Sequence, residues 1–383
     1  MIKGILLFFV VIFSLKISAQ DTLYARKVIS KLCSANFLGR GYVKDGVNKA
    51  AKYLSEELER IGLLKFEKSF SQKYTFPVNS FPGKMSVVIN GKKKLPGIHY
   101  LIEPSSPSFN IKSNLIKKDS VTYEPTDYLK NNNLKIKLKK KLTYGVSTEP
   151  TTNPTLELLK DSFPQDLYHI EIVCENRFFK AFKSQNICGY VKGTQFPDSF
   201  VVFTAHYDHL GAMGKDVYFP GANDNASGVS LLLNLAKYYK NYPSKYSVVF
   251  LFFSGEEAGL LGSKYYSENP LFPLLNIKFL INLDLLGTGD DGIMVVNGTI
   301  FKRQFELLKS INTSKNYLKE VKLRGKAANS DHYWFSELGV PCFFIYTMGG
   351  IKAYHDVYDS DITLPLTKYS EVFKLLVEFT SLL

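Results

Sequence analysis

Cysteine is scarce in this sequence, and its spacing excludes both a disulfide scaffold and a cysteine-based metal knuckle. Only four cysteines occur among 383 residues, namely Cys33, Cys174, Cys188 and Cys342. They form no C-x-x-C pair and no closely spaced framework of the kind that stabilises small secreted domains. Cys342 stands in the apolar run VPCFFI, so we expect it to be a small buried hydrophobic residue.

Apolar runs long enough to cross a membrane are absent after the first twenty residues. A membrane span needs roughly 20 apolar residues, and the run from Gly4 to Leu15 is shorter than that. It follows Lys3 and precedes Ile-Ser-Ala-Gln, which together have the three regions of a signal peptide cleaved after Ala19. An uncleaved anchor is the alternative interpretation. We expect an exported protein, periplasmic or secreted, with no membrane span in the mature chain.

Concentrated positive charge is also lacking, although the formal net charge is +13. The lysines are spread along the chain, and the one dense run is KIKLKKK at residues 135–141. Its first residues alternate lysine with apolar side chains, which is typical of an exposed edge strand that lysine protects from unwanted pairing. We therefore predict no nucleic-acid partner. Hydrophobic residues make up 45% of the chain and charged residues 22%, as in a globular protein with a sizeable core.

The order of apolar segments predicts an α/β fold. Residues 20–75 contain a helix that ends at Gly62, and residues 76–183 show short alternating runs typical of a β-rich insert or subdomain. From residue 184 to 383, nearly continuous apolar strands alternate with segments of helical length. This pattern predicts a mostly parallel mixed sheet with helices on both faces. The predicted organisation is thus a signal peptide (1–19), an N-terminal part of the main domain (20–75), the insert (76–183) and a core (184–383).

Histidine is rare too, with six residues, yet His206 and His209 stand together directly after the apolar run VVFTA. Ligands of open α/β sheets bind beyond the carboxyl ends of strands. Polar residues follow the other predicted strands as well, and the loop GANDNASG lies between the first two. The residues at these positions are His206, Asp208, Asp224, Glu256, Glu257, Asp284, His355 and Asp356.

Carboxylates that meet on one edge repel one another unless positive charge, most simply a metal cation, lies between them. Taken singly, each has an ordinary explanation, such as a helix cap for Asp224 or a solvated surface for the Glu-Glu pair. Two imidazoles with three carboxylates suit zinc or a similar divalent ion. Five ligands complete two three-ligand sites only if one carboxylate bridges both ions.

In this order, the motifs H-x-D, G-A-N-D-N-A-S-G, S-G-E-E-A-G-L-L-G-S, N-L-D and Y-H-x-x-x-D resemble the co-catalytic zinc aminopeptidase family. That family also includes glutaminyl cyclases and the transferrin-receptor ectodomain. The resemblance covers residue 186 to the C-terminus, and FLGRGYVKDG near the N-terminus is similar to secreted bacterial members. The insert carries no specific motif, although it occupies the place of a protease-associated domain in some members.

The resemblance implies a role for each residue of the set. Asp224 would bridge two Zn2+ ions, Glu257 and His355 would complete one site, and His206 and Asp284 the other. Glu256 would be the general base that takes a proton from the metal-activated water. The family's cis peptide bond would here join Asp224 to Asn225.

Further residues are expected around this set. Asp208 is predicted to hold the other ring nitrogen of His206. His209 is expected either to support a ligand or to make a simple loop hydrogen bond. Asp331 is expected either to lie beside the site or to cap a helix. Asp359 is predicted to fix the loop rather than to touch metal. Tyr346, Met348 and Tyr354 are candidates for an apolar substrate pocket, with ordinary packing as the alternative.

These expectations favour a secreted metallo-exopeptidase, most simply an aminopeptidase that acts on peptides. The alternatives are a glutaminyl cyclase with one zinc and a non-catalytic binding ectodomain. The sequence leaves open the oligomeric state, the preferred terminal residue and the role of the insert.

Overall fold

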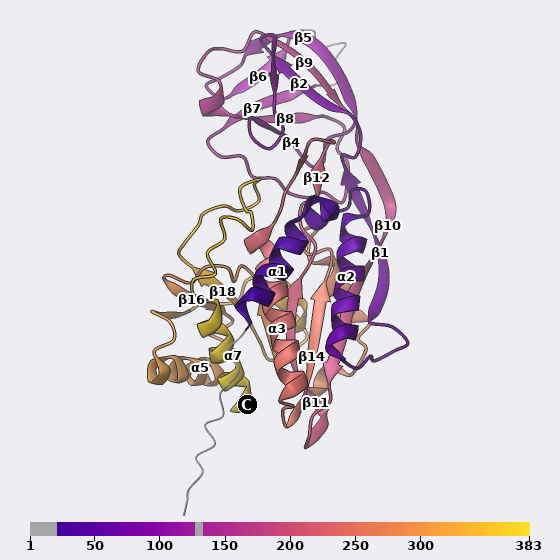
Figure 1. Ribbon diagram of the computed structural model, residues 1–383. Helices are drawn as coiled ribbons and strands as arrows, with labels where there is room; N and C mark the ends of the chain where they lie inside the picture. Colours follow the sequence, from indigo (N-terminus) through magenta and orange to yellow (C-terminus); the bar gives the residue numbers. More distant parts are fainter. Residues whose placement is uncertain (1–20, 127–132) are drawn as a thin grey trace, which may run out of the picture.

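The computed structural model describes residues 21–126 and 133–383 and contains two large sheets (Figure 1). The signal peptide predicted for residues 1–19 lies outside the described residues. Within the described ranges, no helix is both long and apolar enough to span a membrane. All four cysteines are buried and free, and Cys342 is the small buried residue that its apolar surroundings predict.

The main sheet has eight strands in the order β1-β10-β14-β11-β15-β18-β16-β17. Parallel pairing joins β14, β11, β15 and β18 in the centre, and β10 and β16 run antiparallel to their central neighbours. The strand bounds are β1 Ser71–Ser80, β10 Arg177–Val191, β11 Phe196–His206, β14 Tyr246–Phe253, β15 Ile277–Leu283, β16 Gly292–Val296, β17 Val321–Leu323 and β18 Cys342–Met348.

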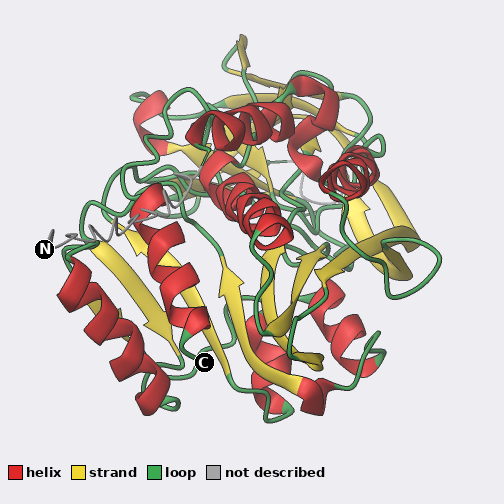
Figure 2. Ribbon diagram, turned by 60° about the horizontal axis from the view of Figure 1, so that its bottom comes forward, coloured by secondary structure: helices red, strands yellow, loops and turns green. Residues whose placement is uncertain are grey.

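Helices cover both faces of this sheet, as the alternation of strands and helices predicts (Figure 2). Their bounds are α1 Thr22–Cys33, α2 Gly46–Ile61, α3 Gly228–Asn241, α4 Leu261–Glu268, α5 Lys302–Lys315, α6 His332–Glu337 and α7 Tyr369–Ser381. The predicted α/β class with a mostly parallel mixed sheet is therefore confirmed. Gly62 ends α2 in the left-handed conformation, as predicted.

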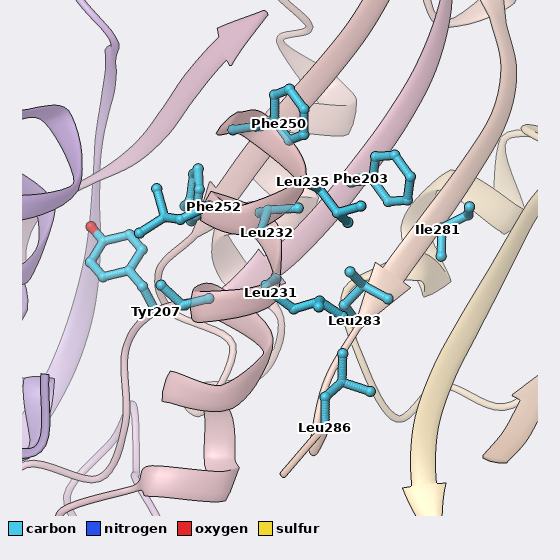
Figure 3. Close-up of a cluster of buried hydrophobic side chains, with 14 of the residues drawn as sticks. Phe203, Tyr207, Leu231, Leu232, Leu235, Phe250, Phe252, Ile281, Leu283 and Leu286 are labelled. Carbon is cyan, nitrogen blue, oxygen red and sulfur yellow. The ribbon is translucent and has the colours of Figure 1, made fainter. Parts of the chain in front are cut away.

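The largest core lies between α3 and the central strands (Figure 3). Leu231, Leu232 and Leu235 of α3 pack in the same cluster as Phe203 of β11 and Phe250 of β14. The alternate residues of the same strands point to the opposite face, where they pack with α4 and α6. Since both faces are buried, these strands consist of nearly continuous apolar runs. The resulting rigid support carries the residues that follow each strand.

The second sheet lies beyond one end of the main sheet and has the order β3-β2-β9-β5-β6-β7-β8-β4 (Figure 1). It extends from Met85 to Cys174, and residues on either side belong to β1 and β10 of the main sheet. The strand bounds are β2 Met85–Ile89, β3 Lys92–Lys94, β4 Tyr100–Ile102, β5 Phe109–Lys117, β6 Thr122–Pro125, β7 Lys135–Lys139, β8 Thr155–Leu159 and β9 His169–Cys174.

Two details of strand placement differ from the prediction. The lysine-rich strand β7 is not an edge strand, because it pairs with β6 on one side and with β8 on the other. Its lysines stay in solvent while Ile136 is buried, so the alternation reflects a sheet with one solvated face rather than an exposed edge. The short strands β16 and β17 were not predicted, because their few apolar residues carry no clear period.

Candidate metal centre and active-site cavity

The carboxyl ends of the central parallel strands meet at one edge of the main sheet. His206 ends β11 in register with Phe253, the last residue of β14, which Glu256 and Glu257 follow. Asp284 follows Leu283 of β15, which pairs with Ile345 of β18. The register of the sheet therefore places residues from separate parts of the sequence on one edge.

Asp224 stands at the centre of this group, with its two carboxylate oxygens facing different partners. Its Oδ1 lies 3.3 Å from His206 Nε2, which is in turn 3.4 Å from Asp284 Oδ1. Its Oδ2 lies 3.0 Å from His355 Nε2, which is 3.3 Å from Glu257 Oε2. One carboxylate thus joins two sets of three donor groups.

These separations match the spacing of ligands around zinc. Bonds of about 2.0–2.1 Å in a tetrahedral arrangement place neighbouring ligand atoms about 3.3 Å apart. Asp284 Oδ1 is buried and accepts no hydrogen bond within the described parts of the chain, an expensive state for a carboxylate without a cation. The donor types and their spacing therefore fit a divalent cation in each set. Glu256 and His209 also lie close enough to complete compact groups, with Glu256 beside His206 and Asp284, and His209 beside Asp224 and Glu257.

Both metal-facing histidines are oriented by backbone carbonyl groups. His206 Nδ1 lies 3.2 Å from the carbonyl oxygen of Asp208, and His355 Nδ1 lies 3.0 Å from that of Tyr144. A carbonyl oxygen can only accept, so Nδ1 of each ring carries a proton, and Nε2 is the atom that faces Asp224 and would bind a cation after giving up its own proton. The support of His206 thus comes from the Asp208 carbonyl rather than from the predicted carboxylate, which is 3.8 Å away.

The insert takes part in holding the site. Tyr144, which follows the strand β7, accepts from the His355 ring and donates its own N–H to the His355 carbonyl. Lys141 pairs with Asp356 at 3.3 Å. The segment between β7 and β8 of the second sheet therefore fixes the loop that presents His355, a role that no sequence motif predicts.

The excess of carboxylates in the cluster favours the binding of protons or of a cation. Burial lowers the pKa of His206, but the carboxylates of Glu256 and Asp284 outweigh it and raise that pKa well above its ordinary value. Burial likewise opposes the charge on His355, yet Glu257 and Asp224 raise its pKa to about 9. Burial raises the pKa of Glu256 well above the usual value, because His206 offsets only part of the effect. A site that draws protons so strongly is one that a cation neutralises.

The loop that carries Asp224 is held by backbone hydrogen bonds. Asp359 accepts from the N–H groups of Asn223 at 2.8 Å and of Asp224 at 3.0 Å, so it fixes the loop that carries Asp224. Gly221 has a φ of 61°, and a Cβ there would lie 2.3 Å from the Asp224 carbonyl oxygen. The peptide bond from Asp224 to Asn225 is cis, as the family resemblance implied.

Asp208 and His209 support the Glu256–Glu257 segment. The Asp208 carboxylate accepts from the N–H groups of Glu256 and Glu257, both at 3.3 Å, and from the Tyr42 hydroxyl. His209 Nδ1 lies 2.7 Å from Glu257 Oε1, the oxygen turned away from His355. Of the two interpretations of His209, the structure shows the one in which it contacts a predicted metal ligand.

Arg40 holds the same region, and sequence reasoning missed it. This fully buried side chain donates to five backbone carbonyl oxygens and pairs with no carboxylate within the ranges 21–126 and 133–383. The acceptors are Leu32, Tyr207, Pro220, Gly221 and Asp224, at 2.7–3.3 Å. The only signal was its place in the motif FLGRGYVKDG. Since Tyr207 and Asp224 belong to the loops of the site, Arg40 ties the N-terminal segment to both.

Replacing Arg40 by Met is expected to lower the free energy of unfolding by at least about 3 kcal/mol, because several buried carbonyls lose a charged donor. Urea denaturation measures the change. Arg26 also donates to two carbonyls, those of Leu364 and Pro365, but its side chain is exposed. The matched change Arg26→Met should cost less than about 1 kcal/mol, and equal losses would contradict the role given to Arg40.

The residues at the start of α6 contact the cluster through Ser330 and Asp284. Asp331 caps no backbone N–H with its side chain, so the helix-cap interpretation is not supported, and burial raises its pKa to about 7 against the opposing effect of His206. Ser330 donates to Asp284 Oδ2 at 3.1 Å and accepts from Asn282 at 2.8 Å. Ser330 therefore orients Asp284, another role that the sequence did not reveal.

His332 gives the fold a specific sensitivity to acid. Burial lowers its pKa to about 4, with partial opposition from the backbone of Ser330 and Ala327, and its ring packs 5.3 Å from that of Phe344. The unfolded chain takes up this proton below about pH 6.5, whereas the folded chain does so only near pH 4. Stability from this group is therefore complete above about pH 6.5 and falls as the pH drops towards 4, by about 3 kcal/mol.

His332→Phe is expected to remove this part of the pH dependence. The measurement is urea denaturation of the metal-free protein at several values between pH 4 and 7, with the variant compared against the parent chain. The variant should show a shallower decline of unfolding free energy over that range. Parallel curves for the two proteins would mean that the neutral ring of His332 is not the cause.

A cavity of about 270 Å³ opens onto the cluster. Tyr346 and Tyr354 line it as predicted for a substrate pocket, but Met348 does not. Met348 ends β18 opposite Gly292 of β16, whereas Phe344, two positions before Tyr346, lines the cavity. The lining residues are His206, Asp224, Glu256, Glu257, Asp284, Leu285, Arg324, Asn329, Phe344, Tyr346, Tyr354 and His355.

Fold and site together define an α/β protein with a carboxylate–histidine metal centre at the carboxyl edge of its sheet. The profile of Peptidase family M28 matches residues 186–380, about half of the chain, and the chain belongs to that family. The expected relationship to zinc aminopeptidases and glutaminyl cyclases is thereby confirmed.

Curated relatives match over shorter stretches. The chain is 32% identical over 149 residues to Aminopeptidase YwaD of Bacillus subtilis, which is 38% of this chain and 31% of that protein. It is 36% identical over 110 residues to a probable zinc metalloprotease of Pyrenophora tritici-repentis, which is 28% of this chain and 25% of that protein. The matches thus span about a quarter to a third of these relatives.

Solved structures share the fold over nearly the whole chain. A peptidase M28 precursor from Shewanella amazonensis has a TM-score of 0.73 at 15% identity, covering 95% of this chain and 93% of that one. A zinc aminopeptidase from Bacillus subtilis has a TM-score of 0.67 at 19% identity, covering 94% of each. A glutaminyl cyclase from Bacteroides thetaiotaomicron has a TM-score of 0.54 at 16% identity, covering 94% and 98%.

Proposed function

We propose that this protein is an exported zinc-dependent exopeptidase that releases amino acids from the N-termini of peptides. The observation that carries the proposal is Asp224, whose two oxygens face two separate histidine–carboxylate pairs. Relatives named as an aminopeptidase and as zinc metalloproteases support the choice of reaction and metal. The signal peptide predicted for residues 1–19 supports export.

Two Zn2+ ions would be held by the two donor sets. His206, Asp284 and Asp224 would hold one ion, and His355, Glu257 and Asp224 the other. Bound zinc lowers the pKa of water towards neutrality and polarises a carbonyl group. The carbonyl acceptors of Asp208 and Tyr144 keep both histidines in the tautomer that such binding needs.

Glu256 is the residue best placed to move protons. One of its carboxylate oxygens lies within 4.8 Å of a ring nitrogen of His206 and of an Asp284 oxygen, and it lines the cavity. In the proposed reaction it takes a proton from the attacking water and passes it to the amine that leaves. Its neighbour Glu257 faces His355 instead, because adjacent residues of the turn point in different directions.

The cavity favours a chain end over a chain interior. Its volume of about 270 Å³ is at the small end for ligand sites. The aromatic rings of Phe344, Tyr346 and Tyr354 provide apolar surface for one terminal side chain. An exopeptidase needs no more room than that beyond the reacting bond.

A direct test compares activities and metal content in one preparation. Aminoacyl peptides, peptides probed for release from the carboxyl end, and peptides with N-terminal glutamine are offered with and without a chelator. The proposal expects amino acids released from the N-terminus, chelator sensitivity and two zinc ions per chain. One ion per chain with ammonia released from glutaminyl peptides would identify a cyclase instead, and metal binding without turnover would indicate a binding ectodomain.

A further inference from the structure

Arg324 lines the cavity but has no acidic partner. It follows the last residue of β17, is exposed, and has its NH1 3.5 Å from the hydroxyl oxygen of Tyr346. Among the ion pairs of residues 21–126 and 133–383, none includes Arg324. Its guanidinium is therefore available to a molecule that enters the cavity.

The neighbouring lysines differ from Arg324 in this respect. Each pairs with a carboxylate of the protein, and none of them lines the cavity. The pairs are Lys319 with Asp291 at 2.8 Å, Lys322 with Glu320 at 3.2 Å, and Lys326 with Glu337. In this segment, the one cation without a carboxylate partner among the described residues is the one that faces the cavity.

The chemistry of the cavity makes this arrangement informative. The other charged or titratable groups that line it are His206, Asp224, Glu256, Glu257, Asp284, Tyr346, Tyr354 and His355. The four carboxylic acids among them belong to the cluster around His206 and His355. Arg324 and Tyr346 instead bring hydrogen-bond donors together, with Arg324 NH1 3.5 Å from the Tyr346 hydroxyl oxygen. An arginine fork binds a carboxylate through two parallel hydrogen bonds, so Arg324 suits a substrate anion in this cavity.

We propose that Arg324 is a specificity-determining residue that binds a carboxylate of the substrate. This inference rests on the proposed exopeptidase function and adds a substrate class to it. The carboxylate could belong to an acidic N-terminal residue, Asp or Glu, or to the C-terminus of a dipeptide. Both sources present the same chemistry to the guanidinium, and simple substrates distinguish them.

The experiment measures kcat/KM of the zinc-loaded enzyme by chromatography of the products. The substrates are Glu-Ala-Ala-amide, Gln-Ala-Ala-amide, Leu-Gly and Leu-Gly-amide. If Glu-Ala-Ala-amide is preferred over Gln-Ala-Ala-amide, Arg324 binds the side-chain carboxylate of the N-terminal residue. If Leu-Gly is preferred over Leu-Gly-amide, Arg324 binds the C-terminal carboxylate. Arg324→Gln should reduce kcat/KM for the preferred acidic substrate about 10- to 100-fold, mainly by raising KM. It should change kcat/KM for the uncharged counterpart by no more than about twofold.

Lys322→Gln is the matched control, because it removes a charge from the same strand outside the cavity and should leave all four values unchanged. Arg324→Lys should restore part of the preference, since it keeps the charge without the fork. Equal loss on charged and uncharged substrates, or no acidic preference in the parent enzyme, would overturn the inference while leaving the exopeptidase proposal intact. No N-terminal cleavage of any substrate by the parent enzyme would overturn the proposed function and this inference together.

Discussion

Glu256→Gln is expected to lower kcat by about 10²- to 10⁴-fold while two zinc ions stay bound. The amide keeps the size of the side chain but cannot accept a proton from water, and general-base catalysis contributes a factor of that size. Glu256 faces the cavity beside His206 and Asp284, and it stands outside the two donor sets that Asp224 joins. Steady-state kinetics with metal analysis of the same samples measures both quantities.

Glu257→Gln provides the matched control, because the two residues are neighbours in one turn. Glu257 Oε2 lies 3.3 Å from His355 Nε2, so its loss should weaken metal binding in that set as well as turnover. The expected contrast is an inactive variant with full metal for Glu256→Gln and an inactive variant with reduced metal for Glu257→Gln. Turnover by Glu256→Gln at the parent rate would assign the base to another residue.

Asp224→Ala is expected to remove both zinc ions, because a single carboxylate serves both donor sets. His206→Ala and His355→Ala should each weaken mainly one ion, since each ring faces only one oxygen of Asp224. Activity should fall to background for Asp224→Ala. Metal content after dialysis, determined by mass spectrometry, distinguishes two shared sites from two independent ones. Retention of one full equivalent of zinc by Asp224→Ala would contradict the bridging arrangement.

Removal of metal from the parent chain should also lower its stability. Zinc held at 1,000 times its dissociation constant stabilises a folded protein by about 4 kcal/mol per site, and here it would also relieve the repulsion among Asp224, Glu257 and Asp284. Thermal unfolding with chelator and after zinc is added back measures the effect. Asp224→Ala is the control, because its melting temperature should no longer respond to zinc.

Much of the fold and the floor of the site could be predicted from the sequence because those features are local or repeat along the chain. Uninterrupted apolar runs such as VVFLFFS indicate strands buried on both faces, and the alternation with helices indicates a largely parallel sheet. Parallel strands bring their carboxyl ends to one edge, so residues directly after the strands could be grouped without coordinates. The predicted set His206, Asp224, Glu257, Asp284 and His355 does meet at that edge.

Several contacts could not be predicted, because they depend on backbone groups or on segments far apart in the sequence. The backbone carbonyls of Asp208 and Tyr144 orient the histidine rings. Since every residue has a backbone carbonyl, residue type does not predict such a contact. Arg40 acts through five carbonyls in the same way. The lysine-rich strand β7 was placed at an edge by its composition, whereas the pairing of β6 and β8 puts it inside the second sheet.

The sequence by itself determined the chemical types at the site: which carboxylates and imidazoles follow which strands, and hence that a divalent cation suits them. Only the tertiary structure decided how those groups are oriented and that one carboxylate lies between two donor sets. It also decided that the insert supports His355, and that Arg324 rather than Met348 lines the cavity. The reason is physical. Residue types and local periods are properties of the chain, whereas orientation depends on packing and hydrogen bonds between segments that meet only in the folded state.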